Sequence, residues 1–303
     1  MEIPLSPVTG SSRVTLEENF SVAEILQAYQ AAQLDVSEYF TGLTQVQLFR
    51  CNDTGYRFFY PYSIIGRSSL YDQLQKTEGY YPAEKWEHTE ALKHIQTTDN
   101  VLEVGCGNGN FLEKLKAKGV SQAKGLDFSD DALRAVQQKG LQGKKESLQS
   151  HATTHAAQYD VVCFFQVLEH IDNIAEFMNA AASVLKPNGK MIVGVPNSNP
   201  YLYRYDRLHT LNLPPHHMGL WNSDALRNLA PHFGLDVVAV ATEDLPWQYR
   251  SQYRKAFIGH YQKHNPLIAK TVAAIPAFVF KSYLSVFNSA AEGRHLLAIY
   301  RKK

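Results

Sequence analysis

The stretch VLEVGCGNGNFLEKL, residues 101–115, decides the fold of this chain. Its first four residues are mostly apolar β-formers that stop at Gly105, which predicts a short buried parallel strand. Glycines at 105, 107 and 109 then allow a sharp turn and a close approach of the backbone to a ligand. Apolar residues recur at helical spacing after the turn, so the unpaired amides of a helix N-terminus would face that ligand.

The spacing of this turn distinguishes between ligands. A dinucleotide site reads G-x-G-x-x-G, whereas this turn reads G-x-G-x-G and has Glu103 two residues before its first glycine. A second acid, Asp127, ends the next predicted strand about 20 residues on, where a carboxylate can bond ribose hydroxyls. The turn and the two acids together predict an adenosine-type ligand, against the alternative of a tight strand–helix turn that binds nothing.

Length and composition limit the class of protein. A chain of 303 residues with a net charge of +1 fits one large α/β domain with appendages and argues against a general nucleic-acid partner. Cys51, Cys106 and Cys163 are scattered and odd in number, so we expect no disulfides and a cytoplasmic protein. The N-terminus lacks the pattern of a secretory signal, and no stretch approaches the about 20 apolar residues of a spanning helix.

The order of predicted elements favours a doubly wound sheet. Strands and helices alternate after residue 98, and such alternation builds a parallel sheet covered by helices on both faces. Residues 1–20 have no clear pattern and are expected to be a loose lead-in. Helices are predicted at 22–34 and 82–95, and later strands at 144–148, 159–165, 190–195, 235–241 and 295–301.

From Asn100 to Phe233 the chain resembles the class I S-adenosylmethionine-dependent methyltransferases. The glycine turn and Asp127 are similar to the family's first motifs, YDVVCFFQVLEHI to its fourth, and LKPNGKMIVGVPN to the turn and strand that follow. Two further segments, the CNDTGYRFFYP block (51–61) and the PPHH loop (214–217), resemble those of a bacterial subgroup of this family. The resemblance implies a Rossmann-like seven-stranded α/β sheet whose last strand is antiparallel, S-adenosyl-L-methionine as cofactor, and methyl transfer.

The resemblance also carries over a cofactor site. The family's acid after the third strand has no clean match here, so Glu146 and Ser147 are both candidates for the adenine contact. The expected cofactor residues are Glu103, Gly105, Cys106, Gly107, Gly109, Asp127, Phe128, Glu146, Ser147, Phe165, Gln166 and Val167.

Three histidines are candidates for catalysis. His216 and His217 follow two prolines, which restrict the backbone as a positioning loop requires, so one of them is expected to be a base or an acceptor clamp. The alternative is that they only brace Trp221. His170 either faces the cofactor pocket or bonds across the end of the sheet. We expect no metal, although Asp206 and His209 lie within reach along the chain.

The acceptor is predicted from an insertion before the last strand. Residues 245–291 contain no Asp or Glu but six Lys and Arg among many aromatic residues, in helices broken by Pro266 and Pro276. The charge is either an ordinary solvated face or a site for an anionic acceptor: a phosphorylated or nucleotide-linked sugar, or a lipid-linked molecule reached by peripheral membrane contact. Residues 199–206 are expected to cover the acceptor as a lid.

The predicted organisation has four parts: an N-terminal helical and aromatic lobe (1–97), a cofactor-binding core (98–245), a basic aromatic helical insertion (246–291) and the last core strand (292–303). The predicted function is O-methylation of a small or glycan-type acceptor. N-methylation, or a catalytically silent protein that binds the cofactor, remain the alternatives.

Overall fold

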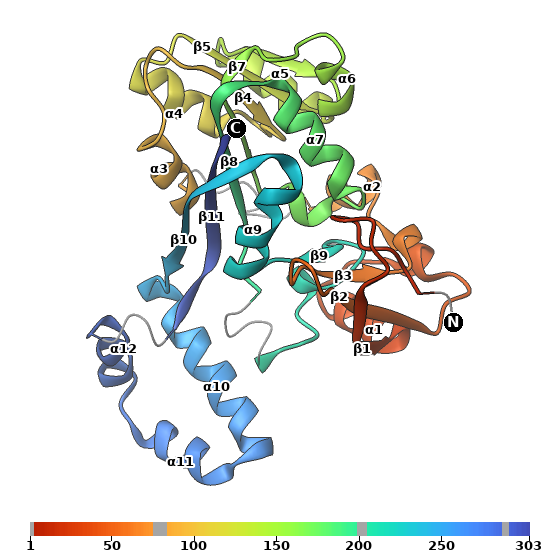
Figure 1. Cartoon of the computed structure of the whole chain (residues 1–303). Helices are drawn as coiled ribbons and strands as arrows, with labels where there is room; N and C mark the ends of the chain where they lie inside the picture. The colour runs from red at the N-terminus through yellow and green to blue at the C-terminus, as the bar shows by residue number, and fades with distance from the viewer. Residues whose placement is uncertain (1–2, 75–83, 199–204, 287–290) are drawn as a thin grey trace.

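A seven-stranded sheet forms the centre of the molecule, in the order β10-β11-β8-β7-β4-β5-β6 (Figure 1). The computed structural model describes residues 3–74, 84–198, 205–286 and 291–303. Strands β8, β7, β4, β5 and β6 are mutually parallel, and β11 is antiparallel to both its neighbours, which confirms the predicted α/β class. The strands are β4 (Asn100–Val104), β5 (Gln122–Asp127), β6 (Gly143–Lys145), β7 (Tyr159–Phe165), β8 (Leu185–Pro196), β10 (Leu235–Asp244) and β11 (Glu292–Lys302).

Helices cover both faces of this sheet, as its alternating side chains require. On one face, Val101 and Cys163 pack against α3 (Trp86–Leu92), α4 (Asn110–Lys118) and α5 (Asp130–Gln138). On the other, Leu102 and Val162 pack with α6 (Leu148–Ala152), α7 (Ile174–Val184) and α9 (Ser223–Leu229). Because the central strands are buried on both faces, they read as near-continuous apolar runs. Their carboxyl ends meet at one edge, which is where the glycine turn lies.

Some predicted boundaries were wrong. The third strand is shorter than expected, because it stops at Lys145 and Leu148 already belongs to α6. Asn222 caps α9: its side chain accepts a hydrogen bond from the amide of Ala225. The loose lead-in contains a strand, β1 (Val14–Ser21), which pairs with β2 (Gln45–Cys51) at the edge of a second sheet.

The second sheet joins the N-terminal lobe to the core. Its order is β1-β2-β3-β9, where β3 is Arg57–Tyr60 and β9 is Gly219–Leu220, far along the chain. The rings of Tyr56 and Trp221 are 4.1 Å apart, so the aromatic block packs directly on the segment after the PPHH loop. Around the sheet lie α1 (Val22–Ala31), η1 (Ser37–Phe40), η2 (Tyr62–Ile64) and α2 (Ser68–Leu74).

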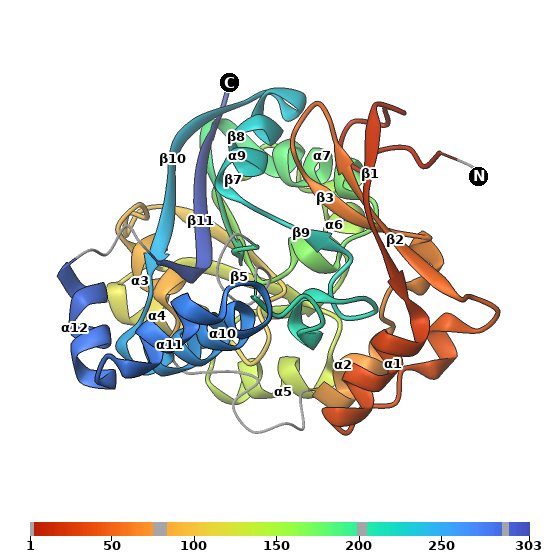
Figure 2. The ribbon, with the colours of Figure 1, turned by 90° about the horizontal axis from the view of Figure 1, so that it is seen from below.

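The insertion is helical, as predicted, and projects from the end of the sheet (Figure 1). It runs from η6 (Trp247–Tyr249) through α10 (Arg250–His264) and α11 (Pro266–Ala274) to α12 (Ala277–Val286). In Figures 1 and 2 it lies on the opposite flank of the core from the second sheet. Among the described helices, none alone has the length and hydropathy to cross a membrane; residues 266–274 and 277–285 meet those limits only together, across a 95° bend.

Candidate active site

A large cleft lies along the carboxyl edge of the seven-stranded sheet. Its volume is about 2030 Å³, whereas a pocket for one small ligand usually holds about 300–1,000 Å³. The cleft therefore has room for a cofactor and an acceptor side by side. It is lined by Glu103, Gly105, Cys106, Gly107, Asp127, Phe128, Glu146, Phe165, Gln166, Val167, His170, His216 and His217, and of the predicted site residues only Gly109 and Ser147 are not part of this lining.

The glycines of the turn are required by backbone geometry. Gly105, Gly107 and Gly109 all have positive φ, at 72°, 51° and 82°. A Cβ on Gly105 would lie 2.5 Å from a methyl carbon of Val167, so the backbone passes too close for any side chain. Gly109 is the N-cap of α4 and packs against α5, so it shapes the turn without lining the cleft.

Asp127 braces the same turn from the next strand. Its Oδ2 accepts a hydrogen bond from the amide of Gly107 at 2.8 Å, and its Oδ1 accepts one from the amide of Ser129 at 2.9 Å. A carboxylate has about four acceptor positions, so two remain for a ligand that presents a pair of hydroxyls. The arrangement fits a ribose lying across the turn.

Glu103 is a buried acid with a carboxyl oxygen that makes no hydrogen bond within the described residues. Its side chain is only 3% exposed, and its Oε2 has no hydrogen-bond partner among the described residues. Burial raises the pKa of this carboxyl well above its ordinary value. A positively charged ligand group near Glu103 would lower the cost of ionising it, and S-adenosylmethionine carries such groups.

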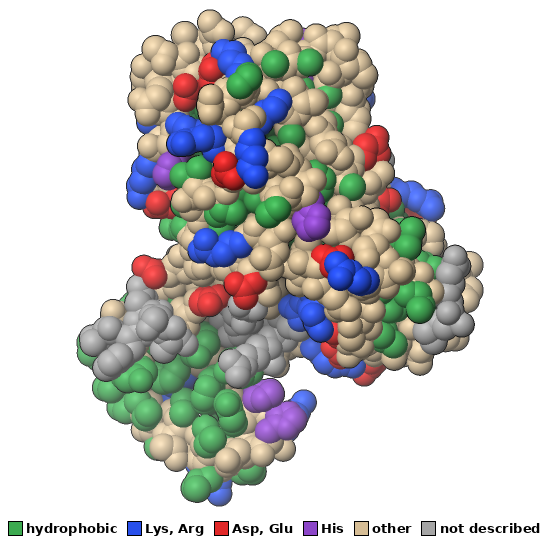
Figure 3. Space-filling view, in the orientation of Figure 1, with side chains coloured by type: hydrophobic (Ala, Val, Ile, Leu, Met, Phe, Trp, Pro, Cys, Tyr) green, Lys and Arg blue, Asp and Glu red, His purple; other side chains and the backbone are tan. Residues whose placement is uncertain are grey.

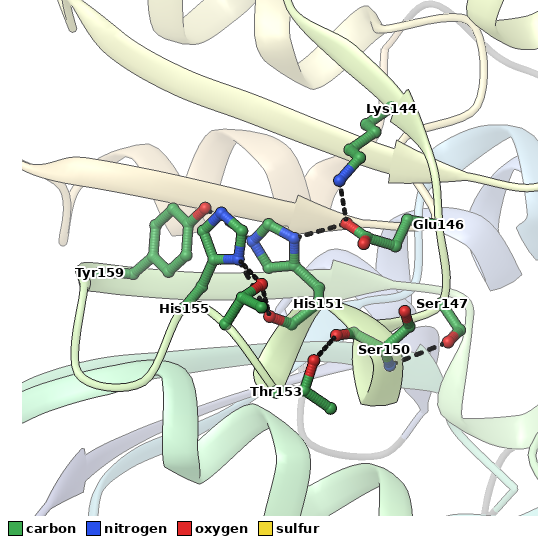
Figure 4. A network of polar contacts seen from close by, with 9 residues as sticks. Lys144, Glu146, Ser147, Ser150, His151, Thr153, His155 and Tyr159 are labelled. Carbon is green, nitrogen blue, oxygen red and sulfur yellow. Dashed lines mark hydrogen bonds and ion pairs between the residues drawn. The ribbon is translucent and has the colours of Figure 1, made fainter.

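Glu146 is held at the edge of the sheet by a polar network, shown in Figure 4. Its Oε2 accepts from Nδ1 of His151 at 2.7 Å and pairs with Nζ of Lys144 at 3.0 Å. The hydrogen bond from His151 lowers the pKa of Glu146, which keeps the carboxylate charged. Nε2 of His151 in turn lies 2.8 Å from the hydroxyl of Tyr159. Ser147 has a different role, because its hydroxyl accepts from the amide of Ser150 and caps α6.

The three candidate histidines converge on one point of the cleft. His170 lies in η3 (Leu168–His170), and its Nδ1 donates to the backbone carbonyl of His216 at 2.6 Å. The ring centroids of His170, His216 and His217 are 4.4–5.2 Å apart, and one ring nitrogen of each lies within 4.8 Å of the others. His170 thus lines the cleft and also hydrogen-bonds to the PPHH loop.

The backbone around these rings is fixed by hydrogen bonds. The amide of Met218 donates to the carbonyl of Glu169 at 2.8 Å, which ties the PPHH loop to η3. From the N-terminal lobe, the buried hydroxyl of Tyr29 donates to the carbonyl of Leu213 at 2.9 Å. His217 closes the loop through its own amide, which donates to Leu213 at 3.1 Å. The histidines are therefore held by two separate parts of the chain.

The electrostatics of the cluster follow from its burial. Burial lowers the pKa of His170 to about 4 and that of His216 to about 3, and it lowers the pKa of His217 well below its usual value. All three imidazoles are therefore uncharged near neutral pH. Beside them, Glu169 is 1% exposed, and burial raises its pKa to about 8.

The acids that line this part of the cleft were not predicted as site residues. Neither carboxyl oxygen of Glu169 has a hydrogen-bond partner among the described residues, and Oε1 lies 3.8 Å from Nε2 of His170. Glu87 accepts a hydrogen bond from Gln166 at 3.3 Å, and Glu243 contacts Nδ1 of His295 at 3.0 Å. The one signal in the sequence was an acid inside an apolar segment, as in VLEHI.

Other predicted residues lie away from the cluster. The side chain of His209 accepts a hydrogen bond from the amide of Leu211 at 3.3 Å and caps η4 (Thr210–Asn212). The third histidine grouped with His216 and His217 is His170. Phe128 is 69% exposed at the rim of the cleft. The predicted lid falls mostly on residues 199–204, which lie outside the described residues. Its last part, Tyr205, lies with its ring 5.0 Å from that of His260 in α10.

Several known proteins match part of this chain. The chain is 33% identical over 118 residues to a ubiquinone biosynthesis O-methyltransferase from Hydrogenovibrio crunogenus, covering 36% of this chain and 48% of that protein. It is 32% identical over 155 residues to the protein of the same name from Marinobacter nauticus, covering 45% and 63%. The chain thus spans about half the length of the curated relatives it matches.

A solved structure described as a SAM dependent methyltransferase from Archaeoglobus fulgidus aligns with a TM-score of 0.49 at 15% identity, covering 71% of this chain and 90% of that one. The model of a family described as a methyltransferase domain matches residues 79–240, which is more than half of the sequence. The chain therefore belongs to the methyltransferase family, whose cofactor is S-adenosyl-L-methionine.

Proposed function

We propose that this protein transfers the methyl group of S-adenosyl-L-methionine to an oxygen atom of a small molecule. One observation carries the proposal: the glycine turn with Asp127 and the histidine cluster with Glu169 open into the same cleft. A cofactor on the first and an acceptor on the second would lie in contact. The partial match to proteins named O-methyltransferases supports oxygen as the atom that receives the methyl group.

We assign the cofactor to the edge formed by β4, β5 and β6. Asp127 would hold the ribose hydroxyls with its two remaining acceptor positions, and Glu103 would lie near the positive end of the molecule. Glu146 follows the neighbouring strand β6 and lines the same cleft, so it would contact the adenine. Phe165 and Val167 form the apolar wall. Once bound, the cofactor supplies a methyl group that is ready for in-line displacement.

The protein's own contribution is to position the acceptor. A displacement of this kind is accelerated mainly by holding the two reacting atoms in line and in contact. We place His216 and His217 as an acceptor clamp, because uncharged imidazoles can accept a hydrogen bond from a hydroxyl. They are poor general bases at their lowered pKa. Glu169 is the unpartnered carboxyl beside them and is placed to take the hydroxyl proton.

Substitution of each loop histidine tests this clamp. His216→Asn and His217→Asn should lower turnover by about 10²-fold or more at the working position and leave the affinity for S-adenosylhomocysteine unchanged. His232→Asn is the matched control, since His232 is exposed in η5 (Ala230–Phe233). If both single variants keep full activity, the loop has only a structural role.

We further propose that the acceptor is lipid-linked and is reached from a membrane surface. The insertion contains six Lys and Arg and no acid, which leaves 24 Lys and Arg against 29 Asp and Glu in the rest of the chain. Hydrophobic side chains gather over the end of the molecule that α10–α12 form (Figure 3). Leu267 and Phe278 there are 74% and 72% exposed. Exposed apolar residues among cations fit an anionic membrane surface.

The six basic residues of the insertion differ in their surroundings, and one of them, Lys281, lies over the ring of Trp247 at 5.4 Å. Arg250 is buried and donates to the carbonyls of Leu245 and Lys281, and Arg254 donates to three carbonyls at the end of α11. These two arginines hold the helices together. Three of the lysines are exposed and can contact an anionic membrane surface: Lys255, Lys263 and Lys270.

The base of the insertion connects this surface to the cleft. Pro246, Gln248 and Tyr249 line the cleft, and Arg294 lies over the ring of Tyr249 at 4.7 Å. An acceptor anchored in a membrane under the insertion would thus enter at this end of the cleft. We place the reaction at the cytoplasmic face of the membrane for two reasons. The cytoplasmic leaflet carries anionic lipids, and all three cysteines are free, as is usual in a reducing compartment.

Vesicle sedimentation tests the membrane contact. The protein should bind anionic vesicles, bind neutral ones weakly, and lose binding as salt is raised. Lys263→Glu with Lys270→Glu should weaken binding by about 30-fold, since each basic residue near the surface contributes about 1 kcal/mol. The control carries Lys116→Glu with Lys118→Glu on α4, with the same change in charge. Equal binding by all three proteins, or no binding by the wild type, would contradict the membrane proposal.

A further inference from the structure

We infer that His170, His216 and His217 form a binding site for a divalent transition-metal ion. The sequence led us to expect no metal, although Asp206 and His209 lie within reach of the histidine pair along the chain. The structure instead brings in His170 from η3, across the cleft. The site follows from geometry alone, and only the role of the ion in catalysis rests on the function proposed above.

The distances are close to those of a tri-histidine site. One ring nitrogen of each histidine lies within 4.8 Å of the other two. Nitrogens 2.0–2.1 Å from a tetrahedral zinc ion are about 3.4 Å apart. The three rings are already grouped, with centroids 4.4–5.2 Å apart, so small side-chain rotations would close the remaining gap.

One ring already makes the hydrogen bond typical of a metal ligand. Nδ1 of His170 donates to the carbonyl of His216 at 2.6 Å. This bond fixes the tautomer and leaves Nε2 with a free lone pair, as in metal sites where the second ring nitrogen binds a carbonyl. The hydroxyl of Tyr71 lies 3.2 Å from the same Nδ1 and further restricts the ring.

A buried acid beside the cluster would balance the charge of the ion. Glu169 is 1% exposed, and neither of its carboxyl oxygens has a hydrogen-bond partner among the described residues. Its Oε1 lies 3.8 Å from Nε2 of His170. An unpartnered buried carboxyl is costly. A cation bound by the three rings would remove that cost.

The donor set indicates the class of metal and its role. Imidazole nitrogens suit zinc, iron, cobalt or nickel, whereas magnesium and calcium prefer oxygen ligands. Three protein ligands and an open position are typical of catalytic rather than structural zinc sites. The cluster lines the cleft, so in the metal-bound protein the acceptor hydroxyl would occupy the open position on the ion instead of hydrogen-bonding to the rings of His216 and His217, and the positive charge would make it more acidic.

Metal titration tests the site without any acceptor or cofactor. The protein is stripped with a chelator and titrated with Zn²⁺ by calorimetry and with Co²⁺ by visible absorption. We expect one ion per chain, with the spectrum of nitrogen-ligated Co²⁺. His170→Gln and His216→Asn should each weaken binding at least about 100-fold, more than the loss of an outer partner, and His232→Asn should not. Binding of S-adenosylhomocysteine by each variant shows that it is folded.

The inference is overturned if the stripped protein binds neither ion in stoichiometric amount, or if folded histidine variants bind it as tightly as the wild type does. Methyl transfer by a protein that binds no metal would leave the proposed function intact. Stoichiometric binding at these residues without methyl transfer to any acceptor would instead count against the proposed function alone.

Discussion

Asp127→Asn replaces one carboxylate oxygen by an amide nitrogen at the point where the turn and the proposed ribose site meet. In the wild type, its carboxylate accepts from the amides of Gly107 and Ser129 at 2.8 and 2.9 Å. The amide side chain keeps one acceptor oxygen and loses the charge, so it cannot hold both amides and a ribose. Removing a hydrogen bond to a charged group costs about 1.5–3 kcal/mol. The expected loss of cofactor affinity is therefore about tenfold to about 150-fold.

Calorimetric titration with S-adenosylhomocysteine measures this loss directly. Asp236→Asn is the matched control, because Asp236 is exposed on β10 and pairs with Lys303 at 3.4 Å. Thermal unfolding of the free proteins separates the contribution of the turn from that of the ligand. Wild-type affinity in Asp127→Asn would refute the assignment of the ribose, and tight binding of NAD by the wild type would refute the adenosine site as described.

Three further substitutions test neighbouring parts of the structure. Gly105→Ala should abolish cofactor binding, because the added Cβ would lie 2.5 Å from a methyl carbon of Val167 and the backbone has a φ of 72°. Gly10→Ala is the control and should leave cofactor binding intact, because Gly10 has a similar φ of 66° but no atom within 4 Å of the added Cβ. Tyr29→Phe should lower the free energy of unfolding by about 0.5–1.5 kcal/mol, since the buried carbonyl of Leu213 loses one of the two hydrogen bonds that it accepts, and it should lower turnover without changing cofactor affinity. Glu103→Gln should stabilise the free protein, increasingly so as pH rises from 5 to 8 in denaturant titrations.

The sign of the pH effect follows from the raised pKa of Glu103. Above pH 4.5, the unfolded chain releases the proton of this carboxyl while the folded protein keeps it, so wild-type stability falls as pH rises. A gap between variant and wild type that is constant with pH would contradict the buried acid. Normal cofactor affinity in Gly105→Ala, or normal turnover in Tyr29→Phe, would contradict the other two predictions.

Local patterns were enough to predict the core. The glycine turn, Asp127 at the end of its strand and the alternation of strands and helices are each encoded within a short segment, and they determine the sheet together with the cofactor edge. Strand β1 was missed because VTLEENFS is polar and lies at an exposed sheet edge. Its strand conformation depends on pairing with β2, which its own sequence does not show.

The acceptor side of the site depends on contacts between distant segments. His170 and His216 are 46 residues apart, and the position of their loop is set by β9, which pairs with the N-terminal lobe. No spacing in the chain relates these residues, so the sequence suggested His209 as a partner instead. No catalytic role was predicted for Glu169, because an acid between apolar residues gives no indication that its carboxyl is buried without a partner.

The most direct test of the proposed function follows a labelled methyl group. The protein is incubated with S-adenosylmethionine labelled in its methyl carbon, together with the lipid and aqueous fractions of a cell extract, and the labelled product is identified. We predict a single lipid-soluble product with the label on oxygen, formed by the wild type and strongly reduced in His216→Asn or His217→Asn. Label on nitrogen, or no transfer by a protein that binds S-adenosylhomocysteine, would contradict the proposed O-methylation.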